Sequence, residues 1–259
     1  MSVLKAHLAA ASDTIYPGQS LVWNQTLISK SGIFEMGFFR PGKSHHYNLG
    51  IWYKMIAEFT VVWEKDLIDF GSELGSMALE LSKDGLRVIK KGVGSEYLGP
   101  CDSTVGVGVG VLLDDGNFIL SSKLDNIVLW QTFEEATGTW LPGAKQLLGF
   151  NTLTNETKTN FLRSSNGWFS AELEVEKNGT GHLVLYNSEY RPNYNTKYGG
   201  NLSRKELANQ YINVSYVSNK NESYFIYFVV SPYKFARIVL NNIGDLSLYV
   251  WDEDLHQWN

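Results

Sequence analysis

The chain has 259 residues, of which 44% are hydrophobic and 19% are charged, and its formal net charge is −5. This composition excludes a disordered chain, and the length allows one large or two medium-sized domains, each with a sizeable core. The acidic balance, with basic runs no longer than Lys90-Lys91, argues against nucleic acid as a partner.

Short segments rich in β-branched and aromatic residues alternate with turn signals along the chain. The expected strands are residues 13–21 (broken at Pro17-Gly18), 26–29, 34–39, 48–53, 59–63, 78–82, 86–90 and 127–133, with a hairpin at 112–120. Turn signals recur roughly every eight to twelve residues, and helical periodicity is suggested only around Lys205–Gln210. The pattern predicts an all-β protein.

The strongest hairpin signal is Leu112–Leu120, where an apolar run enters an Asp-Gly-Asn turn and an alternating strand leaves it. Weaker copies of this turn-and-strand unit occur at residues 31–36, 84–89, 178–186 and 243–249. Repetition of one small unit indicates several small β-sheets. The aromatic content of 14% suits such sheets, because large flat side chains cover pleated surfaces.

Six Asn-x-Ser/Thr sequons, more than composition alone would give, indicate a secreted protein that carries N-linked glycans. They begin at Asn24, Asn155, Asn178, Asn201, Asn213 and Asn221. Residues 1–12 end in small residues after Lys5 and His7, which is typical of a leader or the remnant of a signal peptide. No stretch approaches the apolar length that spans a bilayer, so no membrane span is expected in this chain.

Cysteine and histidine usage excludes several kinds of site. The single cysteine, Cys101, allows neither an intrachain disulfide nor a cysteine-based metal site, and it is interpreted as a free thiol. His45-His46 has no third ligand at a suitable spacing. Residues 106–111 lack the glycine at the sixth place that nucleotide loops require. No metal and no cofactor are therefore expected.

Several ordered motifs resemble the extracellular part of plant S-domain (G-type lectin) receptor-like kinases and S-locus glycoproteins. They are Asp13–Gln19, Phe34–Gly42, Leu49–Lys54, Thr60–Trp63, Leu112–Leu120, Leu129–Phe133, Thr139–Lys145 and Asn221–Phe225. The chain departs from the family pattern at Glu64-Lys65-Asp66, where a paired strand should continue. EGF-like, PAN, transmembrane and kinase segments follow in full-length relatives, so the chain resembles a truncated or divergent member.

The resemblance implies a β-prism II bulb-type lectin domain at residues 13–143, followed by a second lectin-like domain of the S-locus glycoprotein type at residues 144–259. Each lectin unit would contain three four-stranded sheets, and the boundary would lie within residues 134–149. Trp52, Trp63 and Trp130 would pack at the centre of the first domain.

The resemblance also implies a sugar site, which is degenerate in this chain. Bulb lectins bind mannose with a strand reading Gln-x-Asp-x-Asn-x-Val-x-Tyr, which places five side chains on one face. The positions that match or nearly match in the first copy are Asp115, Asn117 and Ile119, whereas Leu113 and Ser121 replace the Gln and the Tyr. A second copy retains only Asp84 and Val88, and the copy that begins at Ser29 retains none. We expect weak or absent mannose binding; alternatively, Asp115 and Asn117 serve only the turn.

The function implied is a non-catalytic recognition module, secreted or on the extracellular face of the plasma membrane. Its partner would be a glycan, a peptide or a partner ectodomain with which it dimerises, in pollen recognition, self-incompatibility or immune-type signalling. The alternative is an all-β carbohydrate-active enzyme using carboxylates such as Asp114-Asp115, Glu134-Glu135 or Asp252–Asp254. Adjacent carboxylates on a strand point to opposite faces, which disfavours that alternative.

Overall fold

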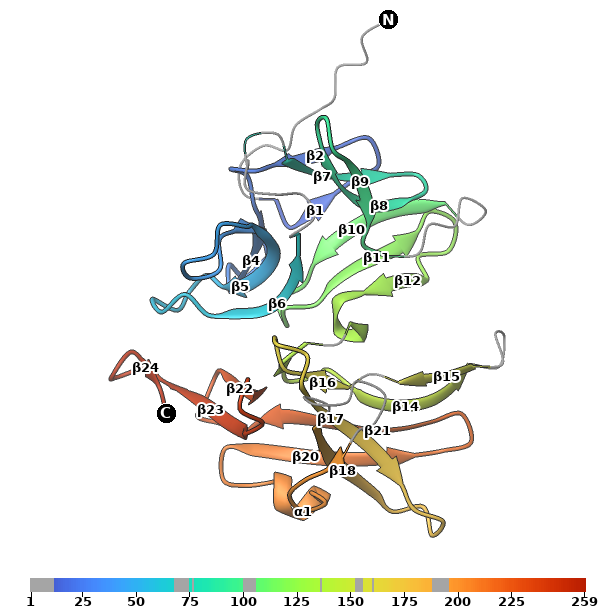
Figure 1. Cartoon of the computed structure of the whole chain (residues 1–259), viewed down its shortest axis with the longest axis vertical. Coiled ribbons are helices and arrows are strands. Elements are labelled where there is room, and N and C mark those ends of the chain that lie inside the picture. The colour runs from blue at the N-terminus through green and yellow to red at the C-terminus, as the bar shows by residue number, and fades with distance from the viewer. Residues whose placement is uncertain are drawn as a thin grey trace, which may run out of the picture. The chain divides into compact units, whose positions relative to one another are not determined.

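The computed structural model describes residues 12–67, 75, 77–99, 106–135, 137–151, 156–159, 161–187 and 196–259. Nearly all of the regular structure in these residues is β, so the all-β prediction is confirmed. The exceptions are the 3₁₀ turn η3 (Thr132–Glu134) and helix α1 (Arg204–Leu207), which overlaps the weak helical signal of the sequence. The chain divides between Glu134 and Glu135 into two compact units (Figure 1), which are described separately.

The described residues of the first unit form three four-stranded antiparallel sheets. The sheet orders are β3-β4-β5-β6, β2-β7-β8-β9 and β1-β10-β11-β12. The strands are β1 (Thr14–Ile15), β2 (Ser20–Val22), β3 (Leu27–Ile28), β4 (Phe34–Phe39), β5 (Asn48–Tyr53), β6 (Val61–Asp66), β7 (Met77–Ser82), β8 (Gly85–Lys90), β9 (Gly94–Tyr97), β10 (Val107–Leu112), β11 (Phe118–Ser122) and β12 (Val128–Gln131). Each sheet is thus a meander of three consecutive strands with one short N-terminal strand added at its edge. The short strands are used in reverse order, because β3 joins the first meander, β2 the second and β1 the third.

The departure from the family pattern at residues 64–66 lies inside a regular strand. Strand β6 continues to Asp66, and its register with β5 places Asn48 opposite Asp66 and Gly50 opposite Glu64. The Nδ2 of Asn48 also donates to the carboxylate of Glu64 at 3.0 Å. The substituted residues therefore pair as the strand requires.

The part of the second unit that the structure describes also forms three four-stranded antiparallel sheets. Their orders are β16-β17-β18-β19, β15-β14-β21-β20 and β13-β22-β23-β24. The strands are β13 (Thr139–Trp140), β14 (Gln146–Asn151), β15 (Glu156–Thr159), β16 (Leu162–Arg163), β17 (Phe169–Val175), β18 (Gly181–Asn187), β19 (Thr196–Lys197), β20 (Ile212–Ser218), β21 (Glu222–Val229), β22 (Ala236–Leu240), β23 (Leu246–Asp252) and β24 (Gln257–Trp258).

The two units follow one connection rule, with a change in the middle sheet. In each unit the N-terminal strands join the later meanders in reverse order, so that β16 joins β17–β19 and β13 joins β22–β24. In the middle sheet of the second unit, the hairpin β14–β15 pairs through β14 with β21, and β20 lies at the edge. Three four-stranded sheets per unit are consistent with a β-prism.

Local geometry repeats between the units as well. A parallel bridge joins Ser12 to Leu27 in the first unit, and a parallel bridge joins Thr137 to Leu162 in the second. Two residues after each bridged leucine, a serine Oγ accepts the backbone N–H of the first residue of the next strand. This bond is 3.0 Å from Phe34 to Ser29 and 3.0 Å from Phe169 to Ser164. The units therefore share their turn chemistry as well as their topology.

The tryptophans expected at the centre of the first unit are all buried, but they belong to two clusters. Trp63 and Trp130 pack edge to face with ring centroids 6.5 Å apart. Trp52 instead contacts Phe39 and Phe59, and its indole N–H donates to Glu35 at 3.2 Å. The predicted core role holds for all three tryptophans, but Trp52 packs in a separate aromatic cluster and its N–H has a polar partner.

Candidate functional site

The candidate sugar-reading stretch forms the turn between β10 and β11. The backbone N–H of Leu113 donates to the carbonyl of Asn117 at 2.8 Å, and the N–H of Gly116 donates to the carbonyl of Leu113 at 3.2 Å. Gly116 has φ +88°, a conformation that glycine adopts without steric cost. The hairpin predicted at 112–120 is confirmed, with Leu112 opposite Phe118.

Asn117 is buried, and its side-chain amide is used inside the protein. Its Nδ2 donates to Gln131 Oε1 at 2.7 Å. Its Oδ1 accepts the Thr132 hydroxyl at 3.2 Å and the Phe133 backbone N–H at 3.1 Å. Only 5% of the residue is exposed. The amide thus holds the turn against β12 and η3, and little of its surface is open to a sugar.

The other positions of the first copy do not form one sugar-facing surface. Asp115 is exposed, and its carboxylate accepts the Asn117 N–H at 3.0 Å. Partial desolvation in the turn raises the pKa of Asp115 above the ordinary aspartate value. Ile119 and Leu113 are half-buried, whereas Ser121, which replaces the tyrosine, is buried. The structure brings Asp115 and Asn117 into one turn and leaves only Asp115 open to solvent.

The second copy retains less. The backbone N–H of Asp84 donates to Ser82 Oγ at 3.2 Å, and its half-buried carboxylate lies 3.9 Å from Lys83 Nζ. Val88 is fully buried in the core of the first unit. Its side chain therefore packs inside the protein and is not available to a sugar ring.

Asp114 makes a contact that sequence patterns did not indicate. Its Oδ1 accepts the backbone N–H of Ser31 at 2.7 Å and the Ser31 hydroxyl at 2.6 Å, which joins the turn before β4 to the turn before β11. These two bonds hold the pKa of Asp114 below its usual value of 3.8, and the bond from the Ser31 hydroxyl contributes most. In the second unit Asn242 takes this place, because its Oδ1 accepts the Asn166 N–H at 3.0 Å.

Five of the six sequons begin at described residues, and these lie where a glycan could be attached. Asn24, Asn178, Asn201, Asn213 and Asn221 are all exposed. Asn178 lies in a turn, where its Oδ1 accepts the Thr180 N–H at 2.8 Å. The sixth sequon, at Asn155, and also Cys101 fall outside the described residues.

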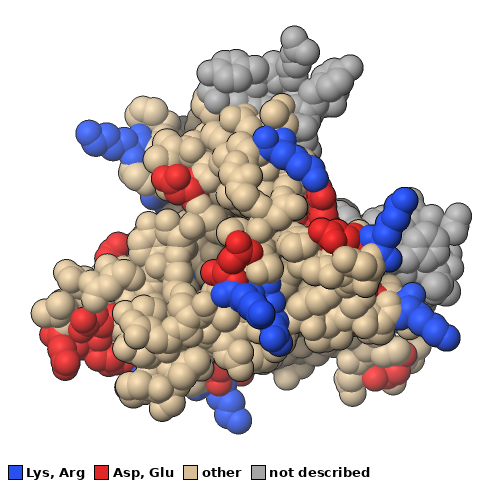
Figure 2. All heavy atoms as spheres, turned by 90° about the horizontal axis from the view of Figure 1, so that it is seen from below, with Lys and Arg blue, Asp and Glu red and all other residues tan. Residues whose placement is uncertain are grey.

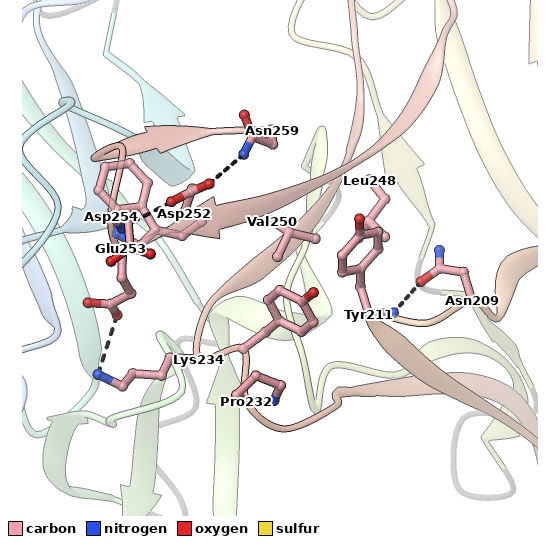
Figure 3. A pocket seen from close by; sticks show the side chains of 12 residues that line it. Asn209, Tyr211, Pro232, Lys234, Leu248, Val250, Asp252, Glu253, Asp254 and Asn259 are labelled. Atoms are coloured by element: carbon pink, nitrogen blue, oxygen red, sulfur yellow. Dashed lines mark hydrogen bonds and ion pairs between the residues drawn. The ribbon is translucent and has the colours of Figure 1, made fainter.

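A cavity of about 700 Å³ lies in the second unit. Its walls come from Asn209 and Tyr211, from Pro232–Lys234, and from Leu248, Val250–Asp254 and Asn259. Figure 3 shows Tyr211, the apolar side chains of Leu248 and Val250, and the acidic turn at Asp252–Asp254. Its size is typical of ligand sites. Sequence reasoning missed this cavity because its walls come from three separate segments with no common spacing.

Surface charge, metal ligands and helix length add three observations. On the face drawn in Figure 2, basic and acidic side chains are interspersed, with no continuous basic surface. Across the described ranges, three or more His, Cys, Asp or Glu residues nowhere gather in a way that could hold a metal ion. In that same part of the chain, no helix has the length and apolarity to cross a membrane.

Comparison with known proteins relates the chain to plant lectin-type receptors. Residues 60–166 match the family model of the D-mannose binding lectin domain. The chain is 32% identical, over 98% of its length, to a G-type lectin S-receptor-like serine/threonine-protein kinase of Arabidopsis thaliana, of which it covers 32%. It is 31% identical, over 99% of its length, to the G-type lectin S-receptor-like kinase SRK of that plant, of which it covers 31%.

There are two further matches, one to a curated protein and one to a solved structure. An S-locus-specific glycoprotein of Brassica oleracea is 27% identical over 91% of this chain, which covers 56% of that protein. Among solved structures, a lectin of the fungus Marasmius oreades aligns with a TM-score of 0.37 and 16% identity, covering 49% of this chain and 92% of that one.

The curated relatives align with nearly the same part of this chain. The chain spans about a third of the length of the receptor kinases it matches, and nearly its own whole length is aligned with them. The predicted resemblance is confirmed: the chain is a relative of the G-type lectin S-receptor-like kinases and S-locus glycoproteins and contains a match to the D-mannose binding lectin domain.

Proposed function

We propose that this chain is a non-catalytic recognition module that binds a glycan, glycoprotein or peptide outside the cell. The observation that carries the proposal is the alignment of 98% of the chain with a lectin-type receptor kinase. Pollen recognition, self-incompatibility or immune-type signalling would be the context, with recognition pairing the module with a related ectodomain. Residues 1–12 would precede a bulb-type lectin domain and a second lectin-like domain.

The sugar-reading turn of the first unit is a structural remnant in this proposal. The burial of Asn117 and Ser121 and the internal bonds of the Asn117 amide support it. Free mannose should therefore show no saturable binding up to millimolar concentration in calorimetry. Asp115→Ala is the informative variant, because Asp115 is exposed and its loss should leave the fold intact. Micromolar mannose binding that Asp115→Ala abolishes would contradict the remnant interpretation.

A glycan array read together with product analysis separates recognition from catalysis. Retention of a glycan without turnover supports a binding module, whereas release of a shortened product supports the all-β carbohydrate-active enzyme. Two carboxylates considered for catalysis have structural bonds instead. Asp114 accepts two bonds from Ser31, and Asp252 accepts the N–H of Leu255 at 2.9 Å.

The extracellular location is tested through the sequons. Production in a plant secretory pathway, followed by mass measurement with and without deglycosylation, should show glycans at exposed sites such as Asn24 and Asn213. Asn→Gln changes at single sequons should each remove one glycan mass. An unmodified product that stays in the cytosol would contradict this assignment.

A further inference from the structure

The cavity of the second unit has an aromatic and apolar side. The rings of Tyr211 and Tyr233 meet edge to face, with centroids 4.9 Å apart and planes at 72°. Tyr233 is 38% exposed, so its ring surface is open to a ligand. Leu248 and Val250 of β23 line the cavity beside these rings (Figure 3). This side of the cavity suits an aliphatic body and a group that is attracted to aromatic faces.

The opposite side is acidic, and its charge is fixed by the turn after β23. The Oδ1 of Asp252 accepts the N–H groups of Asp254 and Leu255 at 3.0 and 2.9 Å, and its Oδ2 accepts Asn259 Nδ2 at 3.0 Å. These donors are neutral, so they orient the Asp252 carboxylate without cancelling its charge. They also lower its pKa, the Leu255 N–H most strongly.

The cavity carries a net negative charge. Asp252, Glu253 and Asp254 contribute three carboxylates. Among the described residues that line the cavity, Lys234 is the one Lys or Arg, and its Nζ lies 3.4 Å from Glu253. Both side chains of this pair are more than half exposed, so the pair is held weakly. An incoming cation could therefore displace Lys234 from Glu253.

These features discriminate between classes of ligand. A phosphate or carboxylate ligand would meet uncompensated like charge, whereas a neutral sugar could donate hydroxyls to the carboxylates but would leave their excess charge uncompensated. A cation would gain both from the carboxylates and from the electron-rich tyrosine faces. We propose that this cavity binds an ammonium or guanidinium group carried on an aliphatic stem, with the cation between the tyrosine pair and the 252–254 turn and the stem on Leu248 and Val250.

Two sources share this chemistry, namely a Lys or Arg side chain of a polypeptide and a free aliphatic amine. Calorimetric titration of the whole chain at low ionic strength would use agmatine for the free cation and an N-acetylated, C-amidated Gly-Arg-Gly peptide for the side chain. Binding of the peptide alone identifies a polypeptide ligand, binding of agmatine alone identifies a small amine, and binding of both supports the shared chemistry. Each of these results supports the proposal.

Charge-changing variants should raise or lower the affinity in the directions expected for a cationic ligand. Tyr233→Ala and Asp254→Asn should each weaken binding, by roughly two- to fivefold. Lys234→Met should tighten it, because Glu253 is then released to the ligand. Glu176→Gln removes an exposed carboxylate outside the cavity and serves as the matched control, with no change expected. Added salt should weaken binding in every active variant.

The proposal is overturned if neither cation binds at millimolar concentration, or if Asp254→Asn and Lys234→Met leave affinity unchanged or move it in the opposite directions. Thermal unfolding of each variant shows that the second unit is still folded. The inference goes beyond the proposed recognition of a glycan or partner, and glycan binding is measured on the same preparation. A silent glycan array together with cation binding that Asp254→Asn weakens would refute only the recognition of a glycan, and the reverse result would refute only the cation site.

Discussion

Asn117 shows how a residue typical of a sugar site can be committed to the fold. Asn117→Ala would leave Gln131 Oε1, the Thr132 hydroxyl and the Phe133 N–H without their partner. Buried polar groups without partners are costly, so we expect a loss of about 2–3 kcal/mol in the free energy of unfolding. Urea denaturation measures it. Asp115→Ala is the exposed control, with a much smaller expected loss, and equal losses in the two variants would contradict the assignment of Asn117.

Asp114 predicts an acid-dependent contribution to stability. Its pKa is lowered in the folded state, so the contribution is complete above the unfolded pKa near 3.8 and is lost as the pH falls through the lower folded value. Asp114→Ala removes the acceptor and should cost roughly 1 kcal/mol at neutral pH. Asp114→Asn copies Asn242 of the second unit, so it should retain most of the stability and lose the dependence on acid.

Denaturant midpoints between pH 2.5 and pH 6 test this prediction. The difference in stability between the unmodified chain and Asp114→Asn should be largest at pH 6 and shrink towards pH 2.5. Ser31→Ala removes the hydroxyl partner and should shrink the same difference. A gap between the unmodified chain and Asp114→Asn that stays constant with pH would show that the Asp114 charge has no role.

At the scale of elements, local signals could be read from the sequence and distant pairings could not. The expected strands 34–39 and 48–53 coincide with β4 and β5, because alternation and turn chemistry act over a few residues. The short strand β1 pairs with β10, with Thr14 opposite Val111, and two residues hold too little pattern to specify such a partner. The inward amide of Asn117 depends equally on η3 and β12, which lie beyond the turn.

The turn between β22 and β23 offers a test at the same scale. Gly244 has φ +93°, and an alanine Cβ there would lie 2.7 Å from the Tyr198 hydroxyl and 2.8 Å from the Phe169 ring. The Tyr198 hydroxyl also donates to the Gly244 carbonyl. Gly244→Ala should thus combine left-handed strain, about 1 kcal/mol, with a steric clash of about 1–3 kcal/mol.

Gly143→Ala is the matched control for Gly244→Ala. Gly143 has φ +84°, but a Cβ there would meet no atom within 4 Å. Gly143→Ala should therefore show the backbone strain alone. In thermal unfolding, the melting temperature of Gly244→Ala should be clearly lower than that of Gly143→Ala. Equal melting temperatures would show that Phe169 and Tyr198 move aside at little cost.

At the scale of the molecule, the described strand pairings are completed within each unit. The strands of the first unit lie between Thr14 and Gln131, and those of the second between Thr139 and Trp258. The described sheets therefore need no strand from the other unit. Such a unit has its own core and the size of an ordinary domain, so it is expected to fold alone.

Separation of the chain between Glu134 and Glu135 tests this independence. Each fragment, produced alone, should show a β-type circular dichroism spectrum and cooperative unfolding, because its three sheets remain complete. A cut inside the second unit after Leu141 is the control. That cut removes β13, in which Thr139 pairs with Val239 and Trp140 pairs with Ile238. It also removes the buried ring of Trp140, whose centroid lies 5.0 Å from that of Tyr227. The fragment beginning at Pro142 should lose cooperative unfolding, whereas equal behaviour of the two second-unit fragments would mean that the domain does not require β13.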